Sequence, residues 1–199
     1  MNGWREIGSL VVGACWGVFA VVWVIGAVVT HARGPRVVRR SGGWWTMSIV
    51  IVALLWVSRR FVSATGWRSL TVDATWLTVL GVVILVASTG LTLWARWRLG
   101  SMWTASPTIK REHELRTDGP YAITRHPIYT GILGMLIGTG LFAGLGPWLP
   151  VLVVTIALIE VKIRSEERLL SGEFPDAYPA YRQRVPQLLP LARRRTRTR

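Results

Sequence analysis

Long runs of uncharged apolar residues dominate this chain of 199 residues. Three clear or nearly clear runs extend over residues 7–30, 44–62 and 72–95, the second being interrupted by two arginines at its end. A fourth runs from Pro127 to Leu145, and a fifth starts near Pro147 and stays apolar only to Ile159. Because about 20 apolar residues in a helix cross the hydrocarbon layer of a bilayer, these runs predict an all-α integral membrane protein with about five transmembrane helices.

The last two runs are separated by Gly144-Leu145-Gly146-Pro147, a composition that is typical of a tight turn. The two runs are therefore expected to form a helical hairpin. The fourth run carries glycines four residues apart, Gly134 with Gly138 and Gly140 with Gly144. This spacing lets helix backbones approach closely and predicts tight packing of the hairpin. A glycine face against which a cofactor lies is the alternative.

Basic residues predict which side of the membrane each connection occupies. Lys and Arg total 24 against ten Asp and Glu, a net charge of +14. Because the excess lies between apolar runs, it favours a membrane surface over nucleic acid as the partner. The first and third connections and the C-terminal segment carry most of the basic residues, whereas the second connection has three and the hairpin turn has none. By the positive-inside rule, the N-terminus is expected outside and the C-terminus in the cytoplasm of a multi-pass membrane protein.

Two polar segments on the cytoplasmic side are the expected site of chemistry. One precedes the fourth run and ends in a predicted turn at Gly119-Pro120 and in Arg125-His126-Pro127. The other follows the fifth run and contains a dense group of charges. Its charged residues are Lys162, Arg164, Glu166, Glu167 and Arg168. A hairpin brings both segments to the same side of the bilayer, and ionisable groups that converge at a membrane boundary predict a functional site.

Plainer interpretations exist for the same residues. A lone histidine such as His126 is often a structural residue at an interface, and Tyr129 also fits an interfacial anchor. Glu166 and Glu167 also suit a solvated helical face, on which Lys162 and Glu166 have the i,i+4 spacing of an ion pair.

Three strings in the second half of the chain resemble the isoprenylcysteine carboxyl methyltransferase family, which lies in a wider group that includes phospholipid N-methyltransferases. They are Gly119-Pro120-Tyr121, the string from Arg125 to Gly131, and the pair Glu166-Glu167. The resemblance covers roughly Ser106 to Pro190 and includes a matching downstream order of aromatic residues and Arg184-Val185-Pro186. The first three spans match the family only in being membrane helices. Together with the apolar runs and the arginine-rich ending, the resemblance predicts three parts: membrane helices over residues 1–105 with three spans, a methyltransferase core over 106–190, and a basic, disordered tail over 191–199.

The resemblance also implies a cofactor and its site. S-adenosyl-L-methionine would lie in a pocket on the cytoplasmic side of the hairpin, with no metal. The cofactor-binding residues implied are His113, Glu114, Leu115, Arg116, Tyr121, His126, Pro127, Ile128, Tyr129 and Glu166. The implied catalytic residues are Arg125 and His126.

Two departures from the family pattern concern the substrate. Lys162 stands where the family has an arginine that holds the substrate carboxylate, with Arg164 two residues later, so both are candidate substrate-binding residues. A lysine keeps the charge but loses the bidentate grip of arginine. Ser106 stands where a glutamine is expected.

The leading expectation for function is carboxyl O-methylation of a lipophilic, isoprenylcysteine-type substrate that enters from the bilayer. Three alternatives remain open: N-methylation of a lipid amine, a nicotinamide-dependent membrane reductase of related fold, and a non-catalytic membrane protein that keeps the fold as a packing module.

Overall fold

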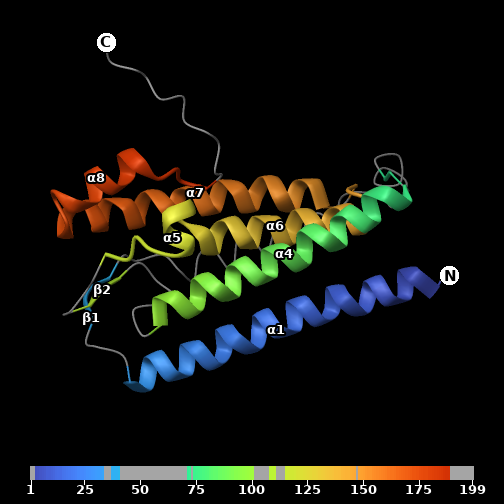
Figure 1. Cartoon of the computed structure of the whole chain (residues 1–199), viewed down its shortest axis with the longest axis horizontal. Helices are drawn as coiled ribbons and strands as arrows, with labels where there is room; N and C mark the ends of the chain where they lie inside the picture. The colour runs from blue at the N-terminus through green and yellow to red at the C-terminus, as the bar shows by residue number, and fades with distance from the viewer. Residues whose placement is uncertain are drawn as a thin grey trace, which may run out of the picture.

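A computed structural model describes residues 3–33, 37–40, 71–72, 74–100, 108–110, 115–146 and 148–188 of the chain. Most of these residues are helical. The helices are α1 (Gly3–Arg33), α4 (Thr75–Leu99), α5 (Pro120–Ile123), α6 (Pro127–Phe142), α7 (Trp148–Glu173) and α8 (Ala177–Arg184). Figure 1 shows α1, α4, α6 and α7 extended lengthwise beside one another, with α4 and α6 running in opposite directions and α8 folded back along the end of α7.

Two of these helices are long and apolar enough to cross a membrane, over Gly3–Val29 and Thr75–Leu99, and α6 is a shorter apolar helix. Both long segments carry exposed large apolar side chains, such as Val24 and Val83. Helix α7 continues to Glu173, well past the end of its apolar part at Ile159. The predicted second span, over residues 44–62, lies outside the described residues. The number of five spans therefore stays a prediction.

Two backbone pairings fix which connections share an end of the bundle. Strand β1 (Val37–Arg40) pairs antiparallel with β2 (Thr108–Lys110), a small sheet that differs from the predicted all-α fold. This sheet joins the first and third connections. At the other end, Thr71 forms an isolated bridge with Leu145 of the hairpin turn. In the described residues, the first and third connections therefore share one end of the bundle, and the residues just before α4 lie beside the hairpin turn at the other.

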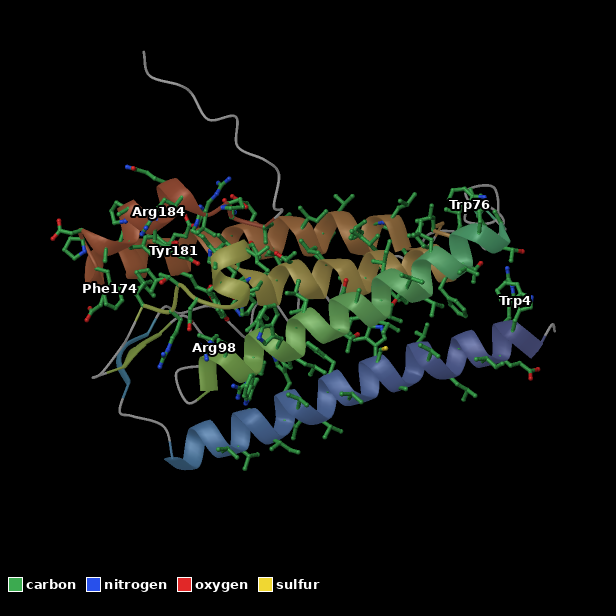
Figure 2. The ribbon with its side chains drawn as sticks, in the orientation of Figure 1. Trp4, Trp76, Arg98, Phe174, Tyr181 and Arg184 are labelled. Carbon is green, nitrogen blue, oxygen red and sulfur yellow. The ribbon has the colours of Figure 1, made fainter. Side chains whose placement is uncertain are left out.

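Labelled side chains mark the same two ends in Figure 2. Arg98 lies at the end of α4 nearest the sheet, and Arg184 lies on α8 at that end of the bundle. Trp4 and Trp76 lie at the opposite end, on α1 and at the start of α4. Tryptophan is enriched at membrane–water boundaries, so its position at the helix ends agrees with a bundle that crosses a bilayer.

The glycines of α6 pack mainly against α4, which corrects the expectation that they pack the hairpin. A Cβ atom built on Gly138 would lie 2.6 Å from the carbonyl oxygen of Gly81 in α4. Built on Gly131 or Gly134, it would collide with Thr92 or Ser88 of the same helix. The two backbones approach most closely where Gly81 faces Gly138, because neither helix has a side chain at that point. Among the glycines predicted to pack the hairpin, Gly140 does face its second helix, with Trp148 3.2 Å from the built Cβ.

The hairpin turn is confirmed. Gly144 has a φ of 90° and Leu145 a φ of 66°. Both lie in the left-handed region, which glycine adopts without strain. Val72 donates a backbone hydrogen bond to the Gly144 carbonyl at 3.0 Å. The turn is therefore tied to the residues just before α4.

Candidate functional site

The turn between α5 and α6 positions the first polar segment. Gly119 has a φ of 57°, and Pro120 begins α5 immediately after it, as the predicted turn requires. His126 occupies the N-cap position of α6, and Pro127 fills the first turn, where the missing N–H costs no hydrogen bond. The side chains of Arg125 and His126 are both buried.

The backbone of Val185–Leu188, which we call the C-terminal strap, accepts hydrogen bonds from this turn. The backbone N–H of Arg125 donates to the Pro186 carbonyl at 2.9 Å, and that of His126 donates to the Gln187 carbonyl at 3.2 Å. The Thr124 hydroxyl donates to the same Gln187 carbonyl at 2.6 Å. The first N–H groups of a helix lack partners within the helix, and the strap supplies acceptors just where α6 begins.

Glu167 of α7 is the centre of a buried charge cluster. Its Oε1 atom accepts hydrogen bonds from Arg125 Nε at 3.0 Å and Nη2 at 2.8 Å, and it lies 3.3 Å from His126 Nε2. Its Oε2 atom lies 3.6 Å from Arg182 Nε. The remaining Arg125 nitrogen, Nη1, donates to the carbonyls of Arg182 and Val185. Every nitrogen of the Arg125 guanidinium therefore donates within the protein.

Glu166, the neighbouring residue, lies at the exposed edge of this cluster. Its side chain is 24% exposed. Oε1 accepts a hydrogen bond from the Tyr129 hydroxyl at 2.5 Å, and Oε2 lies 3.6 Å from His126 Nδ1. His126 thus stands between two carboxylates. Its ring stacks on that of Tyr129, with centroids 5.7 Å apart, and Lys162 Nζ lies 5.5 Å from the Tyr129 centroid.

Electrostatics at the two charged centres follow from this geometry. Burial alone would raise the pKa of Glu167, but hydrogen bonds from His126 and Arg125 outweigh it and lower that pKa to about 2. Burial alone would lower the pKa of His126, yet its hydrogen bonds with Glu166 and Glu167 and their charges raise it overall. The arrangement therefore favours a protonated imidazole beside the ionised Glu167.

An aromatic cluster beside the site is formed by α8 and the end of α7. Tyr178, Tyr181 and Val185 are buried together, and Leu115, Leu170 and Phe174 pack against them. The Tyr181 hydroxyl donates to the Tyr121 carbonyl at 2.6 Å, and the Tyr121 hydroxyl donates to the Ala95 carbonyl of α4. Figure 2 shows Phe174 and Tyr181 at the end of the bundle where α7 meets α8. The cluster links α4, α5 and α8.

The structure sorts the residues that the sequence predicted for the site. It brings together His126, Tyr129, Glu166, Lys162 and Arg125. Leu115 lies against the aromatic cluster, and Tyr121 is buried. Pro127 is fully buried, while Ile128 and Arg116 are half-buried. His113, Glu114, Ser106 and the tail over 191–199 lie outside the described residues.

Arg164 and Lys162 were predicted together as substrate-binding residues but lie on different faces of α7, so a substrate role for Arg164 stays a prediction. The Arg164 side chain is 68% exposed and donates to Glu160, one turn earlier in α7, at 2.9 Å. Two helical residues are about 200° apart around the axis, so Arg164 points away from the face that holds Lys162.

Sequence reasoning missed the role of Glu167 and of the strap. Glu167 is 8% exposed and binds the buried arginine, whereas the sequence analysis assigned no function to it beyond a place in a charged pair. The sequence feature that could have indicated this role is the pair of adjacent glutamates. Neighbouring helical residues point about 100° apart, so each glutamate needs its own set of partners. Nothing in the strap's composition indicates that its carbonyls are used.

The lowered pKa of Glu167 predicts a dependence of stability on pH. The pKa of this carboxyl group is about 2 in the folded state, whereas its ordinary pKa is 4.5. The contribution of Glu167 to stability is therefore fully present above pH 4.5 and is lost as the pH falls from 4.5 to about 2. In that window the unfolded chain takes up a proton that the folded protein does not. We expect the melting temperature in detergent to fall across this window, and Glu167→Gln to flatten the fall. Equal slopes for both proteins would contradict the assignment.

The described helices form an apolar bundle with a buried arginine–glutamate pair at one end, beside a partly exposed carboxylate. Residues 79–172 match the sequence model of the isoprenylcysteine carboxyl methyltransferase family. A solved structure described as the eukaryotic intramembrane Ras methyltransferase ICMT superposes with a TM-score of 0.52, at 24% identity, over 74% of this chain and 52% of that one. At 24% identity, this match supports the fold alone.

Two of three curated relatives are named methyltransferases, and the third is named a metal resistance protein. The protein-S-isoprenylcysteine O-methyltransferase of Schizosaccharomyces pombe is 37% identical over 84 residues, which are 41% of this chain and 35% of that protein. A methanethiol S-methyltransferase of Bradyrhizobium diazoefficiens is 32% identical over 81% of this chain and 64% of its own length. The nickel-cobalt-cadmium resistance protein NccN of Alcaligenes xylosoxydans xylosoxydans is 30% identical over 76% of this chain and 64% of its own length.

This chain is similar to the isoprenylcysteine carboxyl methyltransferase family over residues 79–172. It spans about a third of the length of the first of these relatives and just under two thirds of the other two. Its apolar helices agree with the membrane location of the family.

Proposed function

We propose that this chain is an S-adenosylmethionine-dependent methyltransferase that acts on a lipophilic acceptor at the membrane boundary. The observation that carries the proposal is the pair of adjacent glutamates with separate tasks. Glu167 is buried and holds Arg125 and His126, while Glu166 keeps a partly exposed carboxylate at the edge of the same cluster. A rigid frame with one accessible carboxylate suits a ligand that carries positive charge.

The residues present fit the cofactor. S-adenosylmethionine carries a sulfonium, an ammonium, ribose hydroxyls and a carboxylate, so its site needs acceptors and an aromatic or acidic environment for cations. Glu166 supplies an acceptor for amino or ribose groups, and the Tyr129 ring lies beside it. The bound cofactor would supply an activated methyl group on a sulfonium that is already a good leaving group. We assign Glu166, Tyr129 and His126 to its site, with His113 and Glu114 as further candidates.

The protein's own contribution is then to position the two reactants and to exclude water. Holding two reactants in line contributes on the order of 7 kcal/mol or more to lowering a barrier. The C-terminal strap and the Arg125–Glu167 pair fix the start of α6 by at least five hydrogen bonds between named atoms. Because the donors of Arg125 are all engaged within the protein, its proposed role is to position His126 and the turn rather than to contact the acceptor.

A carboxylate is the acceptor that the site favours. A carboxylate is ionised at neutral pH and needs no base, whereas an amine must first lose a proton. His126 lies between two carboxylates that raise its pKa, so it is poorly suited to accept that proton. Lys162, beside Tyr129 and one turn before Glu166, is the candidate cation for the acceptor's negative charge. An isoprenylcysteine-type carboxyl group meets these requirements.

A thiol is the second candidate acceptor. The relative named methanethiol S-methyltransferase 2 aligns over 179 residues, which cover 81% of this chain. A thiolate shares the negative charge of a carboxylate, so Lys162 suits either acceptor. The two differ in the product, a methyl ester or a thioether.

Calorimetric titration of the detergent-purified protein with S-adenosylhomocysteine tests the cofactor assignment. We expect saturable binding that Glu166→Ala weakens by roughly 10- to 100-fold, the value of a charged hydrogen bond. Glu173→Ala, an exposed glutamate on the same helix, is the matched control and should bind as the wild type does. A folded protein that bound reduced nicotinamide dinucleotide instead would move the assignment to a reductase, and one that bound neither would leave a packing module.

A further inference from the structure

The Tyr129 ring already has a cation over it in this structure. Lys162 Nζ lies 5.5 Å from the ring centroid, while the hydroxyl of the same ring donates to Glu166 at 2.5 Å. An ammonium over an aromatic face is attracted by the ring quadrupole, more strongly where water is excluded. The Glu166 carboxyl group at the ring's hydroxyl places acceptor oxygens beside the same ring. The ring and the carboxylate therefore form a small cation-binding surface.

We propose that Lys162 is a resident cation that a sulfonium ligand displaces from this surface. The inference rests on the proposed function, since it takes S-adenosylmethionine as the ligand, and it extends that function to how the two substrates are coupled. Lys162 and Glu166 are four residues apart on α7 and lie on one face of the helix. A lysine has a flexible four-carbon stem, so its ammonium moves off the ring without any change in the helix.

Displacement gives the site an order of events. With the ring occupied by the ligand's cation, the released ammonium stays within reach of the same helix face and is available to an anionic acceptor. An acceptor carboxylate or thiolate then binds better once a sulfonium is present, and binding free energies of this kind are reciprocal. The Glu167 carboxylate is engaged by Arg125 and His126, so it is not part of the surface that the two cations share.

The two cofactor forms separate this exchange from simple binding. S-adenosylmethionine has the sulfonium, and S-adenosylhomocysteine has a neutral thioether at the same position but keeps the ammonium, ribose and carboxylate. Only the first competes with Lys162 for the ring. The exchange therefore predicts that removing the Lys162 charge improves binding of S-adenosylmethionine relative to S-adenosylhomocysteine.

Titration of both ligands measures that ratio without any turnover. We expect Lys162→Met to shift the preference toward S-adenosylmethionine by roughly 3- to 30-fold, and Lys162→Arg, which keeps a cation, to stay near the wild-type ratio. Arg168→Met, an exposed arginine six residues further along α7, is the matched control and should leave the ratio unchanged.

A spectroscopic measurement follows Lys162 itself in the unaltered protein. The chain has only two lysines, Lys110 and Lys162, so labelling lysine ε-carbons with carbon-13 gives two signals, which Lys162→Arg assigns. We expect the Lys162 signal to move when S-adenosylmethionine is added and to stay when S-adenosylhomocysteine is added.

The outcomes divide cleanly. A Lys162 signal that responds equally to both ligands, or to neither although both bind, overturns the exchange and leaves the methyltransferase proposal standing. An unchanged ratio in Lys162→Met has the same meaning. A folded wild-type protein that binds neither ligand overturns both proposals together.

Discussion

Glu167→Ala should destabilise the folded protein by about 3–5 kcal/mol, because removing one partner of a buried ion pair leaves the other charge uncompensated. Here the uncompensated charge is the Arg125 guanidinium, which donates to Glu167 from two of its nitrogens. The loss should be visible as a lower melting temperature in detergent. It should also abolish cofactor binding, since the start of α6 would lose its anchor.

A double variant separates the lost pair from a general loss of packing. Replacing both Glu167 and Arg125 by methionine removes the buried charges together and should restore a large part of the stability lost in Glu167→Ala, because paired removal is far less costly than breaking the pair. Glu173→Ala, at the exposed end of the same helix, should leave the melting temperature unchanged. If the double variant proved less stable than Glu167→Ala, the pair would not be the source of the effect.

Gly138→Leu should cost about 3 kcal/mol, the upper end of the range for overpacking. A Cβ at this position would lie 2.6 Å from the Gly81 carbonyl oxygen and 2.7 Å from the Leu85 backbone nitrogen. Backbone atoms cannot swing aside as a side chain does, so α4 and α6 must separate. Thermal unfolding in detergent measures the loss.

Gly90→Leu is the matched control for the helix crossing. Gly90 lies on α4, the helix that Gly138 of α6 packs against, but a Cβ built on Gly90 meets nothing within 4 Å. Its replacement should change stability by no more than about 0.5 kcal/mol. Equal losses in the two variants would mean that the close contact of α4 with α6 does not limit stability.

Much of the fold was predictable because apolar length and turn composition act locally. The run over 72–95 predicts α4, and the Gly144-Leu145 turn predicts the hairpin, since both depend on neighbouring residues only. The partner of the α6 glycines was not predictable from spacing. Spacing identifies a bare helix face, but which helix fills it depends on Gly81, more than fifty residues earlier. The pairing of β1 with β2 is non-local in the same way.

The candidate site shows the same division. The strings around His126 and Glu166 indicated which residues meet, because the hairpin brings their two segments to one end. The task of each glutamate depends on the rotation of α7, which the sequence leaves open. The strap is a set of backbone carbonyls, and backbone groups leave no mark in residue composition. Arg125 was predicted as catalytic, and its contacts with Glu167 became visible only in three dimensions.

The most direct test of the account is transfer of a labelled methyl group from S-adenosylmethionine by the purified protein in detergent. Three acceptors should be compared: an S-prenylated cysteine with a free carboxyl group, a lipid amine and an alkanethiol. The account predicts label in a base-labile methyl ester on the first acceptor, lost in Glu166→Ala and kept in Glu173→Ala. Label on the amine or thiol alone would contradict the carboxylate assignment. A folded protein that methylates none of the three would contradict the proposal of a lipophilic-acceptor methyltransferase.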